Sequence, residues 1–435
     1  MTRYSIVAAA VILATGVIQA AEFEPATLMV SASSLLEANV LKGEHYTIAE
    51  SVTVDGYMNH YTVDSEFGQF TAVGDRALKK LLHEIDAIAE LRKMTSFSTG
   101  TDAVIGVVAD TGQSVVNLAI HPVQSVKGIS AGVSRFFKRT SRTAKNVSTD
   151  VAEAVSETFS GDEGSGGDNA DKEEGEPGLT TQLASSFMGT SKAQRDLARE
   201  LKVDPYSDNA ILQADLNRVA QVSGSVGKIS KILIPIPSVV GIATDVSDMV
   251  WNLSPTDLLI QNEEKLKKLG YTDELIAAYF SNKVFSPSEQ TAFVAALESL
   301  DKAKGREVLL NIANSAESQI EGEFVVRSVL LAQLYHENIQ PVIELMSVPS
   351  GLVPVAITES RDGLIFAPLD QLLWTEEVAA AMERLGKLID DHGAIDQNLM
   401  WVGGRVSDMA LARLSASGWV ESTEDFQKLE AMIKD

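Results

Sequence analysis

Residues 45 to 73 read HYTIAESVTVDGYMNHYTVDSEFGQFTAV, and apolar and polar side chains alternate along most of this stretch. Alternation with a period of two predicts strands that bury one face and expose the other. The Asp55-Gly56 dipeptide near its middle suits the tight turn of a β-hairpin. We therefore predict two strands joined at this dipeptide and a third strand from Gln69 to Val73.

A helical pattern follows the predicted hairpin. Asp75 has the residue type of a helix cap. Five apolar residues then recur at the spacing of one helix face: Leu78, Leu81, Leu82, Ile85 and Ala89. This pattern predicts a helix that packs on the hairpin.

The central part of the chain is mostly helical in pattern. Ser286-Pro287-Ser288-Glu289 has the form of a capping box with proline at the first helical position. Further helices are predicted at 191 to 202, 210 to 222, 256 to 269, 272 to 281, 305 to 318 and 322 to 337. Because the connections between them are short, we expect an antiparallel helical array.

The last 85 or so residues change character again. GLVPVAITESRDGLIFAPL, residues 351 to 369, predicts two strands around Arg361-Asp362-Gly363, and a helix is predicted from Thr375 to Ile389. The strand from Leu399 to Val402, a glycine turn, a helix, a short strand and a closing helix at 423 to 433 complete a small α/β unit of mixed sheet. Trp374 and Trp401 are expected to anchor its core.

The predicted fold class is α+β and predominantly α, with an N-terminal hairpin and helix, a central helical array and a small C-terminal α/β unit. The predicted boundaries are 1–20 for a signal peptide, 21–159 for the hairpin with long amphipathic helices, 160–178 for an acidic disordered linker, 179–345 for the helical array and 346–435 for the α/β domain. The linker, SGDEGSGGDNADKEEGEPG, has no large apolar side chain with which to offset the entropy of ordering.

The first residues have the form of a secretory signal peptide. A base at Arg3 precedes an apolar run from Ile6 to Ile18, and small residues follow at Ala20 and Ala21. We predict cleavage after Ala20 and an exported protein, either periplasmic or secreted. An uncleaved membrane anchor is the alternative.

Charge and cysteine content exclude several classes of function. The net charge of -24 makes nucleic acid a poor partner, because affinity for phosphate depends on clustered bases. The sequence contains no cysteine, which excludes thiol catalysis and thiolate metal sites. The six histidines are scattered, and no set of nucleophile, base and metal ligands stands out. We therefore predict no catalytic residue, no metal and no cofactor.

One basic stretch contrasts with this acidity. VSRFFKRTSRTAKNVST, residues 133 to 149, predicts an amphipathic helix. Its apolar face carries Val133, Phe136, Phe137, Thr140 and Ala144, and its basic face carries Arg135, Lys138, Arg139, Arg142 and Lys145. Such a helix suits an anionic membrane surface. The alternative is that the helix docks its apolar face inside the protein while its bases pair with the acidic linker.

A weaker candidate is an anion site at the glycine turn. Gly403 and Gly404 follow a predicted strand, and Ser407 stands at the start of the next helix, where backbone N–H groups can hold an anion. An ordinary tight turn is the alternative interpretation.

Two segments resemble an uncharacterised family of bacterial exported proteins. They are HPVQSVKGISAGVSRFFKR, residues 121 to 139, and ARELKVDPYSDNAIL, residues 198 to 212. The resemblance covers the first half of the chain and implies an address in the bacterial envelope. It carries no activity and no site residues.

These patterns lead to two functional hypotheses. The first is a non-enzymatic envelope protein whose basic helix binds an anionic lipid, an acidic envelope component or a protein partner. The second is an enzyme or small-ligand receptor with a pocket in or beside the C-terminal α/β unit. The oligomeric state is left open.

The lipid version of the first hypothesis predicts binding to anionic vesicles. Replacing all five bases of the basic face by glutamate should abolish cosedimentation of the mature protein with the vesicles, and salt should weaken the binding of the native chain. Equal sedimentation of the native and reversed proteins at every salt concentration would exclude this version.

Overall fold

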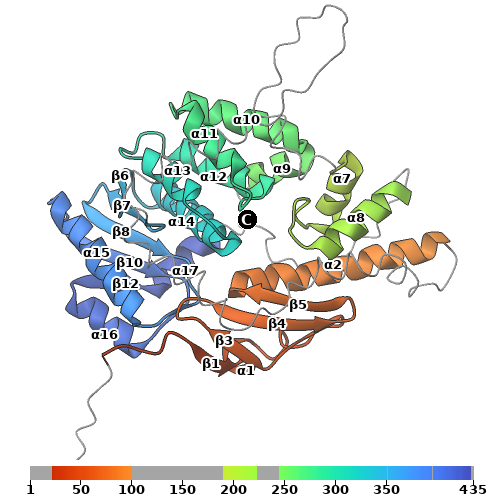
Figure 1. The fold of residues 1–435 in the computed structure, drawn as a ribbon, viewed down its shortest axis with the longest axis horizontal. Coiled ribbons are helices and arrows are strands. Elements are labelled where there is room, and N and C mark those ends of the chain that lie inside the picture. The colour runs from red at the N-terminus through yellow and green to blue at the C-terminus, as the bar shows by residue number, and fades with distance from the viewer. Residues whose placement is uncertain (1–21, 100–189, 223–243, 350, 394, 433–435) are drawn as a thin grey trace, which may run out of the picture.

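The computed structural model describes residues 22–99, 190–222, 244–349, 351–393 and 395–432. Figure 1 shows an N-terminal sheet under a long helix, a group of central helices, and a C-terminal sheet with helices on both faces. This arrangement confirms the predicted α+β class with its three parts in the predicted order. The predicted signal peptide, the basic helix and the acidic linker lie outside the described residues.

The N-terminal sheet is antiparallel and is centred on one long strand. Its elements are β1 (Leu28–Ser31), the short helix α1 (Ala32–Leu35), β2 (Tyr46–Ile48), β3 (Ser51–Val54), β4 (Asn59–Ser65) and β5 (Gly68–Val73). β2 and β3 lie end to end along one edge of β4, and β5 pairs with its other edge. The 45–73 stretch therefore forms four strands, where we had predicted three.

The predicted turn at Asp55-Gly56 is confirmed. The Asp55 carboxylate accepts hydrogen bonds from the backbone N–H groups of Tyr57 (3.1 Å) and Met58 (2.8 Å), which closes the turn between β3 and β4. Gly56 has a φ of +93°, which a side chain would disfavour.

The helix α2 (Asp75–Thr99) is also confirmed, and it serves two cores. Leu78, Leu82 and Ile85 pack on the sheet, while Ile88 and Leu91 farther along pack on helices of the central group. At that end, Arg92 Nε also donates a hydrogen bond to Asp215 Oδ2 at 2.9 Å. α2 thus spans the N-terminal sheet and the helical group (Figure 1).

The central helices follow the prediction closely. They are α7 (Lys192–Leu201), α8 (Ala210–Val222), α9 (Thr244–Asn252), α10 (Pro255–Lys268), α11 (Asp273–Ser281), α12 (Pro287–Ser299), α13 (Glu307–Asn314) and α14 (Gln319–Asn338). The capping box at Ser286 and Glu289 is present at the start of α12. α9 had not been predicted, and α13 is shorter than the predicted 305–318 helix.

The C-terminal unit is a mixed sheet, as predicted. Its elements are β6 (Val342–Ser347), β7 (Pro354–Thr358), β8 (Asp362–Ala367), β9 (Gln371–Leu372), α15 (Glu376–His392), β10 (Gln397–Val402), β11 (Arg405–Val406), α16 (Asp408–Ala416), β12 (Trp419–Ser422) and α17 (Thr423–Ala431). The main sheet has the order β12-β10-β8-β7-β6. β12, β10 and β8 are parallel, whereas β7 runs antiparallel to β8 and β6. β6 crosses the predicted boundary between residues 345 and 346.

Opposite faces of this sheet bind different helices. Phe366 and Trp401 stack edge to face with each other and with Tyr335 of α14. Gly363 lies three residues before Phe366 in β8, so it belongs to the other face of the sheet, where it lies against Ile389 of α15. The predicted burial of Trp374 and Trp401 in the terminal core is confirmed. Among the described residues, no helix has the length and apolar character needed to cross a bilayer.

A loop of the C-terminal unit holds the beginning of α2. The Asp370 carboxylate accepts hydrogen bonds from the backbone N–H groups of Asp75 (3.1 Å) and Asn59 (2.9 Å). Asp75 is thus the first residue of the helix, and the cap that we had assigned to it is supplied by Asp370. The carboxylate of Asp75 accepts hydrogen bonds from the side chains of Asn59 and Tyr61 instead.

This contact predicts the stability of two Asp370 variants. Asp370→Ala leaves two backbone donors without their acceptor and should lower the free energy of unfolding by about 2 kcal/mol in a denaturant titration. Asp370→Asn keeps an oxygen in place and should lose less. An alanine variant as stable as the asparagine variant would show that the contact contributes little.

Candidate functional site

The three parts of the fold enclose a cavity of about 1100 Å³. Its wall comes from the start of α2, the segment after α7, the loop before α12, the first half of α14, the Pro368–Asp370 loop and α17. Several apolar side chains line it: Met58, Val73, Phe285, Phe324, Val326 and Leu330. The volume suits a small organic ligand.

Charged side chains converge on this cavity, and acids outnumber bases among the described lining residues. The bases are Arg76, Lys79, Lys80, Lys283 and Arg327. The acids are Asp75, Asp204, Asp208, Glu289, Glu317, Glu323, Asp370 and Glu430. A wall of this composition is costly unless each charge finds a partner, because opposite charges compensate for lost hydration.

Lys80 has two carboxylate partners, Asp208 in the wall and Glu84 behind it. Its Nζ lies 3.6 Å from Asp208 Oδ1 and 4.0 Å from Glu84 Oε1. Burial opposes its charge, but these carboxylates outweigh burial and raise the pKa of Lys80. Glu84 in turn accepts hydrogen bonds from Ser207 Oγ (2.7 Å) and Asn209 Nδ2 (3.1 Å). The lysine is therefore charged, and neighbouring acids balance its charge.

Arg327 is the second base of the wall that forms an ion pair. Its guanidinium forms an ion pair with Glu430 of α17, and its Nε is buried without an acceptor among the described residues. Burial and the nearby Arg76 lower the pKa of Arg327 to about 9, which leaves it charged at neutral pH. Burial also lowers the pKa of Arg76, with Glu323 opposing that effect.

Glu323 lines the cavity from α14. No described residue donates a hydrogen bond to its carboxylate or forms an ion pair with it at bonding distance. Burial is the main cause that raises the pKa of Glu323, although Lys80, Arg76 and Arg327 are near enough to oppose the shift. The group is thus an acceptor directed at the cavity.

Glu289 lies beside Glu323, on α12. Its Oε2 accepts the Ser286 N–H at 2.8 Å in the capping box. Burial and repulsion by Glu323 raise the pKa of Glu289 from 4.5 to about 7. A carboxyl group that titrates near neutrality is a recognised mark of functional sites.

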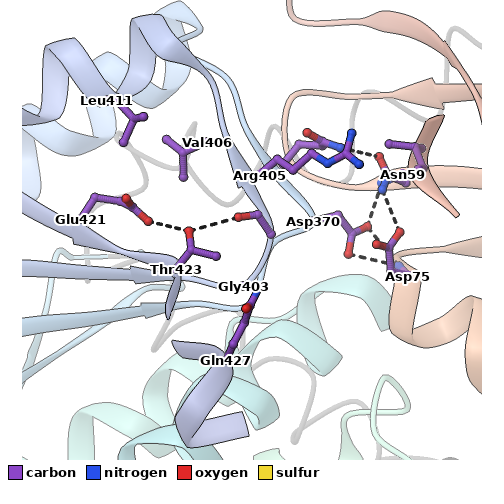
Figure 2. A pocket seen from close by; sticks show the side chains of 13 residues that line it. Asn59, Asp75, Asp370, Gly403, Arg405, Val406, Leu411, Glu421, Thr423 and Gln427 are labelled. Carbon is purple, nitrogen blue, oxygen red and sulfur yellow. Dashed lines mark hydrogen bonds between the residues drawn. The ribbon is translucent and has the colours of Figure 1, made fainter. Parts of the chain in front are cut away.

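A second hollow of about 550 Å³ adjoins the cavity. Figure 2 shows Asn59, Asp75 and Asp370 joined by hydrogen bonds on one side of it, and Glu421 and Thr423 on the other. Asp75, Asp370, Gly403, Gly404 and Gln427 line both spaces. Burial and the neighbouring Asp75 raise the pKa of Asp370 to about 7. Asp370 therefore belongs to a wall between the two hollows.

The predicted glycine turn forms part of this wall. A Cβ on Gly404 would lie 1.9 Å from the Asp370 carbonyl oxygen, so only glycine allows this close approach. The N–H groups of Gly403, Arg405 and Ser407 donate to the carbonyl oxygens of Ala367, Asp370 and Leu372. Ser407 caps α16, and its hydroxyl also contacts the Glu24 carboxylate. The anion site at this turn stays a prediction.

The other predicted site residues lie outside the described part of the chain. These are the five bases and the apolar face of the 133–149 helix. The sequence also contains a G-x-S-x-G spacing at Gly128, Ser130 and Gly132, which the prediction of no catalytic residue had not used. These three residues lie outside the described part of the chain too. Within the described ranges, no group of three or more potential metal ligands was found.

The structure brings together five residues that the sequence had not assigned to a site: Arg76, Glu289, Glu323, Arg327 and Asp370. One signal was present in the sequence. Arg76, Lys79 and Lys80 place bases in the first turns of a helix, against the preference set by the macrodipole. Residues placed against a local preference often serve a site.

Comparisons with known protein families, with curated proteins and with solved structures found no match to this chain. Its function is therefore argued from the cavity itself.

The buried carboxyl groups predict a pH-dependent effect of Glu289→Gln. Because the folded state raises the pKa of Glu289 from 4.5 to about 7, folding is favoured while the group is protonated. That stability is present below the unfolded pKa and is lost as the pH rises through about 7. At about pH 8 the variant should be more stable than the native chain by at most about 3 kcal/mol, at 1.36 kcal/mol per pKa unit.

Denaturant titrations at several pH values test this prediction. The advantage of Glu289→Gln should shrink as the pH falls toward about 5. Glu264→Gln is the matched control, because Glu264 is an exposed residue of α10 outside the cavity. A stability difference that does not change with pH would contradict the shifted pKa.

Proposed function

We propose that this protein binds a small charged organic molecule in the cavity between its three parts. The supporting observation is that apolar side chains, charged side chains and the Glu323 carboxylate, which receives no hydrogen bond from the described residues, line one space of about 1100 Å³. Such a combination of an apolar wall with a few polar groups is typical of ligand pockets.

An enzyme that acts on this ligand is the second candidate. It is favoured by Glu289, whose pKa of about 7 suits a group that gives and takes protons near neutral pH. A receptor and an enzyme differ in the fate of the ligand. Incubating an identified ligand with the protein and following it by NMR separates them, because only an enzyme consumes it.

The basic helix remains a separate proposal. We propose it from the sequence alone, as a surface for an anionic partner that does not involve the cavity. Binding to vesicles would therefore not count against the ligand cavity, and the two proposals have independent tests.

Blocking the cavity tests the ligand proposal. Ala77, in the first turn of α2, lines the cavity and is partly exposed to it. Ala77→Trp should fill part of that space and abolish binding. Ala412→Trp is the matched control, since Ala412 is an exposed residue of α16 outside the cavity.

The measurement is thermal unfolding with a panel of cationic, anionic and zwitterionic small molecules. A ligand that binds the folded state raises the unfolding temperature by mass action. We expect a rise for at least one charge class with the native chain and with Ala412→Trp, and none with Ala77→Trp. No shift with any class, or an equal shift with both tryptophan variants, would overturn the proposed site.

A further inference from the structure

We infer that the ligand of this cavity carries a protonated amine or guanidinium group, which lies against the carboxylates of Glu289 and Glu323, and an apolar body that contacts the remaining wall. This inference rests on the proposed function and names the chemical class of the ligand.

The two glutamates present unused acceptors to the same space. The Glu323 carboxylate receives no hydrogen bond from the described residues. Glu289 uses Oε2 for the Ser286 N–H, and its Oε1 receives no hydrogen bond from the described residues. A charged donor placed between the two groups would satisfy both, because ammonium and guanidinium groups carry several N–H donors and no acceptor.

Two cations of the wall already have carboxylate partners of their own. Lys80 lies against Asp208 and Glu84, and Arg327 forms its ion pair with Glu430. Among the described lining residues, eight acids stand against five bases, so their formal charges sum to a negative value when all the acids are ionised. An incoming cation lowers this excess, whereas an incoming anion increases it.

Apolar side chains on the elements that carry the two carboxylates determine the rest of the ligand. Phe285 precedes α12, while Phe324 and Leu330 lie on α14, the helix that carries Glu323. A hydrocarbon body would bury apolar surface against these side chains. The ligand class is thus a cationic head on an apolar body.

Binding of a cation in the cavity should change the protonation of the two glutamates. Burial and repulsion by Glu323 raise the pKa of Glu289 to about 7, so part of the population holds a proton there near neutral pH. Burial also raises the pKa of Glu323. A bound cation favours the ionised carboxylates and displaces those protons. Binding of a cation should release protons and strengthen as the pH rises, while binding of an anion should take protons up and weaken.

The experiment uses three probes with the same hydrocarbon chain: hexylamine, hexanol and hexanoate. Isothermal titration calorimetry with the full chain, in buffers of different ionisation enthalpy, gives the affinity and the number of protons exchanged. We expect hexylamine to bind most tightly, with proton release and a roughly tenfold gain in affinity from about pH 6 to about pH 8.

Two variants locate the cationic head. Glu323→Gln and Glu289→Gln should each weaken hexylamine binding about tenfold or more, because each removes a charge-assisted hydrogen bond. Glu264→Gln should leave it unchanged. Both cavity variants lose a costly buried charge, so they should fold, and circular dichroism with thermal unfolding checks this.

The outcomes separate the inference from the proposed function. Tighter binding of hexanoate with proton uptake, or equal binding of hexanol and hexylamine, would overturn the cationic ligand while the cavity remained a binding site. Hexylamine binding that survives Glu323→Gln and Glu289→Gln unchanged would also overturn it. If none of the three probes binds, the inference fails, and the wider panel with Ala77→Trp decides whether the site fails with it.

Discussion

The Asp370 carboxylate is the interaction on which the arrangement of this molecule depends. It accepts N–H groups from Asn59 and Asp75, and its own backbone N–H donates to Tyr57, so one residue of the C-terminal unit holds both the hairpin turn and the start of α2. The contact places Arg76 and Lys80 on the wall of the large cavity. Asp370 also lines both hollows, the smaller of which Figure 2 shows. The position of the candidate site is therefore a consequence of this docking.

Charge balance explains the character of the cavity. Lys80 and Arg327 are stabilised by acids of the wall, whereas Glu289 and Glu323 lie close together with few donors. Burying two carboxylates in this way is costly, and partial protonation lowers the cost when no cation is present. A cationic ligand would replace the protons and recover the electrostatic energy. The same imbalance thus accounts for the raised pKa values and for the ligand class that we infer.

Local patterns predicted most of the described fold, because hairpin turns, capping boxes and apolar periodicity act over a few residues. The Asp55-Gly56 turn and the Ser286 capping box are examples. The predicted boundary between residues 345 and 346 cut through β6, because the pairing of β6 with β7 forms only in the folded sheet. The cavity could not be predicted. Asp370 and Asp75 lie 295 residues apart, and Glu289 already had a complete local role as a capping residue. In so acidic a chain, a pair of carboxylates carries little information by itself.

The most direct test is a pH titration of the side-chain carboxyl carbons by ¹³C NMR, with the signals of Glu289 and Asp370 assigned by their loss in Glu289→Gln and Asp370→Asn. It measures whether the cavity holds carboxyl groups that lack compensating positive charge. Our account predicts that both signals titrate near pH 7. Titration of both groups near pH 4, the range of ordinary exposed carboxylates, would contradict it.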